Sequence, residues 1–174
     1  SEEGVIFQSF SKFYIYKDNK VEVRYGLGEP LLFAHQIKGR VWMERIPSGL
    51  ELWNGKGFAK LKSHLDNVMS ILPFDNERFL VGTAKQGLFL LSADGTATAW
   101  MPDLPISKML REAQLNNGLQ LNEQTFAFGT IKNGIFIIDK QGRLLQHIHK
   151  RNGLQNNTVL SMAQALGMAR VPNA

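Results

Sequence analysis

A strand pair that occurs twice is the feature of this sequence that most constrains its fold. Residues 79–91 and residues 126–138 share one layout: an apolar strand that ends in Gly-Thr, a short turn closed by Gly, and a second apolar strand. Gly82 in the first copy and Gly129 in the second lie 47 residues apart. A repeat at an offset of this size is typical of proteins built from a series of similar structural units.

Two weaker copies precede the strong ones. Residues 40–53 have the same layout around Gly49, and residues 5–16 fit it with polar residues where Gly is expected. Each pair is followed by a turn and a further short strand, and a strand candidate precedes each of the last three pairs. The preceding candidates are Leu31–Phe33, Val68–Leu72 and Leu115–Leu121; the following ones are Val21–Val23, Ala97–Trp100 and Leu144–His149.

Each repeat therefore has four short strands, here called a to d in chain order. Repeats of about 40 to 50 residues with four strands are typical of β-propellers. The c strands, Leu88–Leu91 and Ile135–Ile138, are apolar without alternation, as expected for a blade buried on both faces between two others. The sequence predicts an all-β fold, a β-propeller of four-stranded antiparallel blades, with about four blades present as a partial ring.

The predicted propeller segment is 1–163, and 164–174 is predicted to be an irregular tail. Only a turn near Ile106–Glu112 is expected to be helical. The predicted blades are approximately 5–25, 30–61, 64–101 and 105–149, followed by the first strand of a next blade at 157–163.

This register begins near a strand b and ends with a strand a, so an open arc would expose an apolar blade face and a strand edge at each end. Three arrangements would relieve this exposure. The strand near Thr158–Met162 could pair beside Val5–Ser9 and close four blades, two copies could form one ring, or the chain could be part of a larger ring. We expect the isolated chain to self-associate.

Gly153–Met162 and the Gly-Thr…Gly strand pairs resemble the two-component regulator propeller repeat. That repeat runs Gly-Leu-x-x-Asn-x-Val-x-x-Ile, then an aromatic strand ending in Gly-Thr, then Gly-Leu and an apolar strand. The likeness covers most of residues 5–163, with Met43-Glu44 at the Gly-Thr position of the second repeat. It implies the periplasmic sensor region of a Bacteroidetes-type hybrid two-component protein. Such a region recognises carbohydrate-derived ligands and signals to a histidine kinase, which is not in this chain.

Composition narrows the function further. The 174 residues are 44% hydrophobic, carry a net charge of +5 and include no Cys, which excludes disulfides and thiolate metal sites. Lys and Arg are scattered, so no nucleic-acid contact is expected. No apolar run approaches the roughly 20 residues of a membrane span, so this segment is expected to make no membrane contact. Ser1–Gly4 do not resemble a signal peptide, which leaves the location open.

No catalytic set is recognisable, and no cofactor or metal is expected. His147 and His149 could begin a metal site, because alternate strand residues face one way. No third ligand is near in sequence, which favours a surface strand instead. Trp42 and Trp53 are expected to pack between blades. Trp100 is the best of the three as a candidate for stacking on a sugar ring, but a structural role is favoured for it as well.

The turns between strands b and c share one face of a propeller with the connections between blades. On that face the sequence predicts a basic rim that would suit an anionic ligand such as an acidic sugar. Its candidate residues are Arg45, Lys85, Lys132, Lys108 and Arg111. The favoured function is a non-catalytic, ligand-binding propeller. A propeller lyase or glycoside hydrolase and a protein-interaction scaffold are the alternatives.

Overall fold

The structure is a computed structural model, and it describes residues 4–25, 29–54 and 57–164. In this part the chain forms fifteen β-strands in four antiparallel sheets, one α-helix, α1 (Pro105–Ala113), and a 3-10 turn at Lys150–Asn152. The predicted all-β fold with a single helical turn near Ile106–Glu112 is therefore confirmed.

Each sheet is one blade, and its strands follow chain order from the inside outward. Blade 1 has three strands in the described residues, and blades 2 to 4 have four each. Blade 1 comprises β1 (Val5–Gln8), β2 (Lys12–Lys17) and β3 (Lys20–Tyr25); blade 2 comprises β4 (Leu31–Ile37), β5 (Arg40–Arg45), β6 (Gly49–Trp53) and β7 (Phe58–Lys60). Blade 3 comprises β8 (Val68–Pro73), β9 (Phe79–Thr83), β10 (Leu88–Leu91) and β11 (Ala97–Ala99); blade 4 comprises β12 (Leu115–Asn122), β13 (Thr125–Thr130), β14 (Ile135–Asp139) and β15 (Leu144–Ile148).

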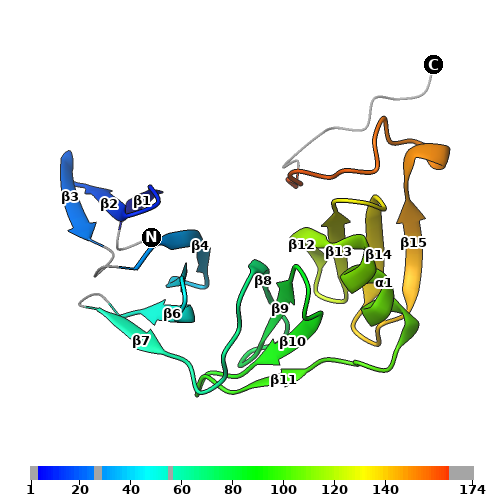
Figure 1. Cartoon of the computed structure of the whole chain (residues 1–174), viewed down its shortest axis with the longest axis horizontal. Coiled ribbons are helices and arrows are strands. Elements are labelled where there is room, and N and C mark those ends of the chain that lie inside the picture. Colours follow the sequence, from blue (N-terminus) through cyan, green and yellow to red (C-terminus); the bar gives the residue numbers. More distant parts are fainter. Residues whose placement is uncertain (1–3, 26–28, 55–56, 165–174) are drawn as a thin grey trace.

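The four blades form a U-shaped arc with blade 1 and blade 4 as its two arms (Figure 1). The a strands β4, β8 and β12 lie on the inner side, and the d strands lie outside. The two arms stand apart, and in the described residues no strand of the C-terminal segment pairs with β1. The chain thus adopts a partial ring of propeller blades and does not close four blades on itself.

The blades stack through three apolar clusters, each between two neighbours. Phe13 of blade 1 packs against Val41 and Met43 of blade 2. Trp42 joins blade 2 to Phe79 of blade 3, with the two ring centroids 5.7 Å apart. The largest cluster lies between blades 3 and 4 and includes one face of α1; its members are Leu72, Leu80, Leu88, Trp100, Ile106, Leu110, Ala113, Leu115, Phe126, Phe128, Phe136 and Ile138. Burial between two neighbouring blades explains why the c strand of blade 3 is apolar without alternation, whereas in blade 4 Ile135 and Ile137 are half-buried.

The Gly-Thr motif closes the turn between strands b and c. The buried hydroxyl of Thr83 donates to the carbonyl of Gly87 at 2.9 Å and accepts from the amide of Gln86 at 3.0 Å. Thr130 makes the same two bonds in blade 4, with Gly134 and Asn133. Gly87 and Gly134 have positive φ, of 102° and 75°, which glycine adopts without a Cβ penalty. The motif therefore specifies one turn geometry twice.

Blade 2 replaces this motif with a pair of charged residues. Strand pairing places Glu44 opposite Leu50, as Gly82 lies opposite Leu88 and Gly129 opposite Ile135. The Gly-Thr position is therefore occupied by Glu44 and Arg45, and the prediction of Met43-Glu44 was wrong by one residue. A one-residue offset also exchanges the two faces of a strand, because side chains alternate.

The residue at the Gly position of strand b contacts the start of the following blade. The carboxylate of Glu44 accepts bonds from the backbone amides of Asn67 and Val68, where β8 starts. A Cβ on Gly82 would lie 3.1 Å from the Leu115 side chain, at the start of β12. A Cβ on Gly129 would lie 2.7 Å from Val159. Val159 thus occupies the place of a first residue of strand a, although residues 155–164 form no assigned strand.

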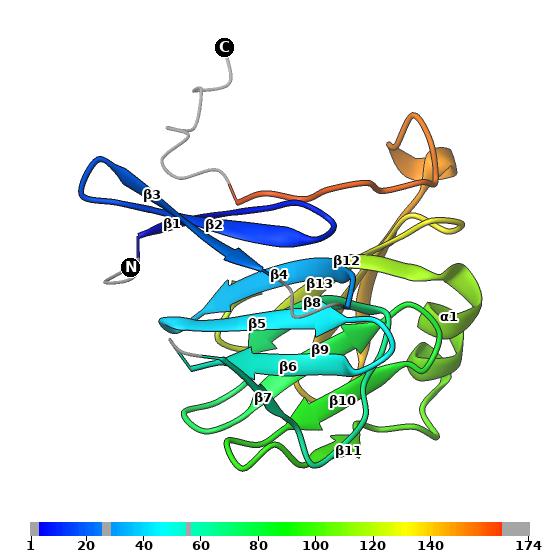
Figure 2. The same cartoon turned by 60° about the vertical axis from the view of Figure 1, so that its left-hand side comes forward.

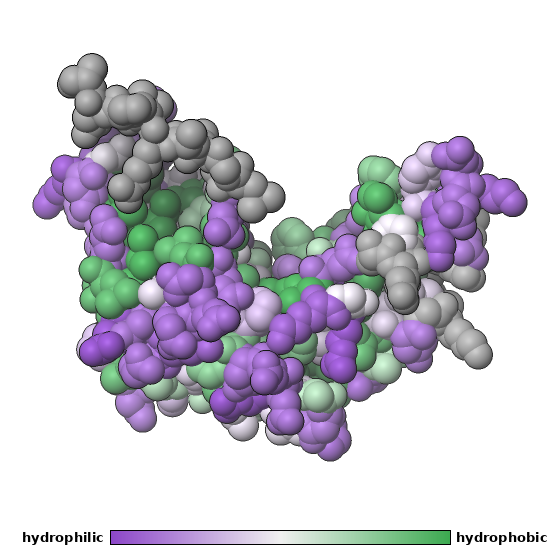
Figure 3. All heavy atoms as spheres, turned by 180° about the vertical axis from the view of Figure 1, so that it is seen from behind, coloured by the Kyte–Doolittle hydropathy of each residue, from purple (hydrophilic) through white to green (hydrophobic). Residues whose placement is uncertain are grey.

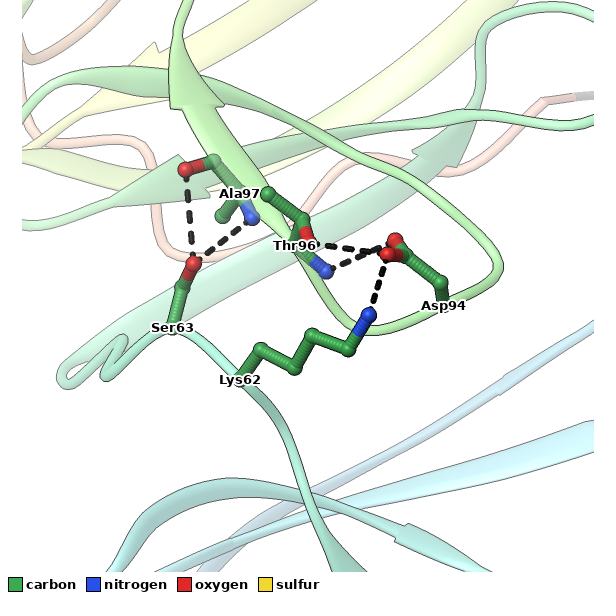
Figure 4. Close-up of polar contacts among 5 residues, drawn as sticks. All are labelled: Lys62, Ser63, Asp94, Thr96 and Ala97. Carbon is green, nitrogen blue, oxygen red and sulfur yellow. Dashed lines mark hydrogen bonds and ion pairs between the residues drawn. The ribbon is translucent and has the colours of Figure 1, made fainter.

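Polar contacts also join the outer parts of blades 2 and 3. Lys62, in the connection after β7, donates from Nζ to Oδ2 of Asp94 at 2.6 Å, and Asp94 also accepts from Thr96 in the turn before β11 (Figure 4). Beside it, Ser63 bonds the backbone of Ala97. The bond from Lys62, followed by those from Thr96, lowers the pKa of Asp94 to about 2.

Candidate functional site

Helix α1 builds the face that carries the b–c turns (Figure 2). Pro105 lies in the first turn of the helix, where its missing amide donor costs nothing. The helix ends at Gln114, which has a left-handed φ of 59°. Ile106, Leu110 and Ala113 bury one face of the helix against blades 3 and 4. The carbonyls of Ala113 and Gln114 accept from the amides of Lys132 and Ile131, so the helix end is tied to the b–c turn of blade 4.

Four of the five predicted rim residues lie on this face. Lys85 and Lys132 are exposed at equivalent places in two b–c turns, and Lys132 lines a 280 Å³ pocket with Met109, Glu112, Ala113 and Asn133. Arg111 extends from α1 over the turn of blade 3, with Nη1 3.2 Å from where a Cβ of Gly87 would lie. Lys108 is 72% exposed and lies 3.8 Å from Glu112.

Arg45 does not belong to the exposed rim. It corresponds to Thr83 and Thr130 rather than to Lys85, it is 8% exposed, and its Nη1 lies 2.7 Å from Oε2 of Glu51. A second ion pair, at 3.5 Å, joins it to Glu29. Reading the register of blade 2 one residue early moves Arg45 from the end of strand b to the first residue of the turn, the position of Ala84 in blade 3.

The tryptophans are part of the core. Trp42, Trp53 and Trp100 are 1%, 8% and 4% exposed. Trp53 packs edge-on against Phe13 at 5.1 Å, and Trp100 packs against Phe74 at 6.2 Å. Inter-blade packing of Trp42 and Trp53 is confirmed, and the structural alternative holds for Trp100, whose ring is not presented to solvent.

His147 lies in β15 and His149 directly follows it. Their side chains point the same way, as predicted, with ring centroids 4.7 Å apart. Each has a local protein partner. His147 stacks on Phe136 at 4.2 Å, with its Nε2 2.7 Å from the carbonyl of Asn133, and His149 caps the 3-10 turn by accepting from the amide of Arg151. Within the described ranges no three His, Asp or Glu side chains converge as metal ligands would.

A larger cleft lies on the opposite face, where the a–b turns of three blades meet. It measures about 490 Å³ and is the site that sequence reasoning missed. Blade 2 contributes Lys38, blade 3 contributes the turn after β8, and blade 4 contributes β12, its following turn and a c–d turn. The lining residues are Lys38, Pro73, Phe74, Asp75, Asn76, Gln120, Glu123 and Lys140.

Phe74 is the aromatic element of this three-blade cleft. Its ring stacks on Phe126 with centroids 6.1 Å apart, so it is anchored in the core. Lys140 Nζ and Arg78 Cζ lie 5.1 Å and 5.3 Å from its centroid, within the range of cation–π attraction. A fixed aromatic ring with polar side chains around it suits a ligand that has both an apolar face and hydroxyl groups.

The cleft has charges of both signs. The Asp75 carboxylate is engaged by Arg78, at 2.6 Å and 2.8 Å, and Lys38 donates to the Asp75 carbonyl at 2.9 Å. Burial raises the pKa of Asp75, but the bonds from Arg78 and the amide of Glu77 outweigh it and leave the pKa lowered. The polar wall is therefore held in place by the protein, and it is more balanced in charge than the rim.

Within the described residues, no helix has the length and apolar character needed to cross a membrane. No protein-family model matches the sequence. No curated protein matches it either.

Solved structures do share its fold. The extracellular domain of a hybrid two-component system from B. thetaiotaomicron aligns over 90% of this chain, with 17% identity and a TM-score of 0.59. The WD40 β-propeller domain of Doa1 aligns over 89%, with 12% identity and a TM-score of 0.61, and the designed protein Ika8 over 92%, with 11% identity and a TM-score of 0.52.

These alignments cover only part of each solved chain. The present chain spans 23% of the two-component extracellular domain and 52% of each of the other two. At such identities the likeness concerns the fold alone. Together with the four sheets and their order, it establishes that this chain folds as an arc of β-propeller blades.

Proposed function

We propose that this chain is the ligand-recognition segment of an extracytoplasmic sensor propeller, with a carbohydrate-derived ligand bound in the three-blade cleft. The observation that carries the proposal is the cleft itself, in which Phe74 is surrounded by Lys38, Gln120, Glu123 and Lys140. Sugars present apolar C–H faces to aromatic rings and hydroxyls to amides, carboxylates and ammonium groups. Because three blades build it, a bound ligand would couple their relative positions.

The sensor role rests on two supports. One is the repeat motif, which resembles two-component regulator propellers; the other is the shared fold with an extracellular domain of a hybrid two-component system. In this proposal the blades detect the ligand outside the cytoplasm, and a histidine kinase outside this chain receives the signal. The basic rim around Lys85, Arg111 and Lys132 is the second place for a ligand, and its charge favours an acidic sugar.

Calorimetry against neutral and acidic oligosaccharides tests the proposal. We expect a neutral oligosaccharide to bind, and Gln120→Ala with Lys140→Ala to weaken it about tenfold or more, as the loss of two hydrogen bonds predicts. The matched control is Lys85→Ala with Lys132→Ala, which should leave that affinity unchanged. If only this control pair lost affinity, the ligand would bind at the basic rim and not in the three-blade cleft.

Absence of binding by every sugar would overturn the carbohydrate assignment. Chromatography of the sugars after incubation separates recognition from catalysis, because a lyase or glycoside hydrolase would release shorter products. Unchanged sugars with measurable binding are the expected result.

A further inference from the structure

The b–c turns of the four blades hold their first residue in a repeated way. In blades 2, 3 and 4 the amides of Ile46, Ala84 and Ile131 donate to the carbonyl that precedes strand a of the same blade, at 3.0, 2.9 and 2.9 Å. Strand pairing gives Phe10 this place in blade 1, where its carbonyl accepts from the amide of Leu31 at 2.8 Å. Each turn is therefore anchored beside the start of a strand a, and its first side chain is presented from a fixed backbone.

Two of these four side chains are large, apolar and exposed. Phe10 is 64% exposed in blade 1, and Ile46 is 42% exposed in the adjacent blade 2. Neither side chain belongs to the three apolar clusters that join the blades. Both stand in water at the tips of anchored turns, and contact with an apolar layer would remove them from it.

The same face carries six cations. The second turn residue is Lys in blades 3 and 4, helix α1 adds two cations, and the 3-10 turn after β15 adds two more. The 3-10 turn lies beside the b–c turn of blade 4. Asn157 joins the two, because its side-chain oxygen accepts from the amide of Lys150 and its carbonyl accepts from the amide of Gly134, both at 2.8 Å. The cations are Lys85, Lys108, Arg111, Lys132, Lys150 and Arg151.

These cations are less neutralised than the charges of the opposite face. Figure 3 shows that opposite face, where hydrophilic side chains surround smaller hydrophobic areas. Two of its acids each lie 2.6 Å from an arginine three or four residues further along the chain. Among the six cations, Lys108 lies 3.8 Å from Glu112, and the other five form no ion pair within the described residues. Asp66 and Glu112 lie beside them and offset only part of their charge.

We propose that this turn face, made of the b–c turns, α1 and the 3-10 turn, docks on an anionic lipid surface. Phe10 and Ile46 enter the layer below the headgroups, and the six cations contact lipid phosphates. An anionic bilayer complements both parts of the face, since it has a plane of negative charge with an apolar layer beneath it. The sequence predicted no membrane contact because it has no spanning run, but docking on the surface requires none. This inference does not rest on the proposed ligand of the three-blade cleft.

Sedimentation of the chain with lipid vesicles tests the role of charge. Vesicles of phosphatidylcholine with phosphatidylglycerol should bind it about tenfold or more tightly than vesicles of phosphatidylcholine alone, and high salt should weaken the binding. Each lysine near an anionic surface contributes about fivefold in affinity, so Lys85→Glu with Lys132→Glu should weaken binding about twentyfold or more. The matched control is Lys20→Glu with Arg40→Glu, two exposed residues that adjoin turns of the opposite face, and it should retain the affinity.

Phe10→Ser tests the apolar part of the contact. It should weaken vesicle binding about tenfold or more, as expected when an inserted aromatic side chain is lost. Its side chain is exposed, so the fold should persist; Leu144→Ser, 42% exposed at the start of β15, is the control. Undiminished binding by Phe10→Ser, or equal binding of the unmodified chain to both kinds of vesicle, would overturn the proposal. Tighter binding to soluble polygalacturonate, unaffected by Phe10→Ser, would also overturn it and assign the face to an acidic polymer.

Discussion

The carboxylate of Glu44 in blade 2 accepts a hydrogen bond from the backbone amide of Val68, the first residue of blade 3, at 2.9 Å. The same carboxylate accepts from the amide of Asn67. At the carbonyl of Val68, the contact comes from His35 of β4, whose Nε2 lies 3.3 Å from the oxygen. Two side chains of blade 2 thus hold the backbone at the start of blade 3. In blade 4, Asn116 and Asn117 similarly donate to the carbonyl of Val159, at 3.0 Å and 2.9 Å.

Glu44→Ala should destabilise the arc by about 1–3 kcal/mol, because it leaves the buried amide of Val68 and the half-buried amide of Asn67 without their acceptor. Glu44→Gln, which keeps one oxygen acceptor, should cost less. Urea denaturation measures both free energies of unfolding. Glu77→Ala, at an exposed turn, is the control. Equal stability of Glu44→Ala and the unmodified protein would show that this contact does not hold the two blades together.

His35 should make stability depend on pH below neutrality. Burial lowers its pKa from 6.5, although the bond to the Val68 carbonyl opposes the shift. The folded protein therefore favours the neutral ring, and this stabilisation is fully present above pH 6.5 and is lost as the pH falls toward the lowered pKa. Burial raises the pKa of Glu44, against the bonds from the Val68 and Asn67 amides, so its contribution has the opposite sign.

The difference between the unmodified protein and His35→Gln isolates the histidine. As the pH is lowered below 6.5, the free energy of unfolding should fall more steeply in the unmodified protein than in His35→Gln. The two slopes should differ by at most about 1.4 kcal/mol per pH unit. Gln36→Asn, one residue along β4, should retain the full pH dependence. Parallel curves for His35→Gln and the unmodified protein would contradict the prediction.

Gly129→Ala should destabilise the end of the arc. The new Cβ would lie 2.7 Å from Cγ1 of Val159 and 2.5 Å from Oδ1 of Asn117, so both of these side chains would have to shift. Overpacking of this kind costs about 1–3 kcal/mol. Gly57→Ala is the matched control, because no atom lies within 4 Å of its added Cβ. Thermal unfolding of the two variants should differ clearly, and similar losses would count against close packing at Gly129.

Lys62→Met should raise the pKa of Asp94 from about 2 toward 3.8, since the bond from Lys62 is the largest cause of its shift. The bonds from Thr96 should keep the pKa below 3.8. Titration of the Asp94 carboxyl carbon by NMR measures the change directly. In the unmodified protein the associated stability is present above pH 3.8 and is lost as the pH falls toward 2. An unchanged pKa in Lys62→Met would show that the ion pair is broken in solution.

The local parts of the fold were predictable because they are encoded by neighbouring residues. Gly-Thr and the closing Gly specify the b–c turn through bonds that Thr83 makes within four residues, and apolar runs specify the c strands. Blade 2 was harder to align, because Glu44 and Arg45 replace the motif and only strand pairing with Leu50 and Gly49 reveals their register. Exposed Lys85 and Lys132 were placed correctly for the same local reason.

By itself, the sequence determined the repeat, the four-strand blades, the b–c turns and the helical turn, since each depends on residues close together in the chain. The tertiary structure decided which side chains meet across blades. Lys38, Phe74 and Lys140 line one cleft only because three blades bring their turns together, and Arg45 is buried only because Glu29 and Glu51 converge on it. Contacts between residues far apart in sequence depend on how the blades stack, and no single segment of the chain encodes that stacking.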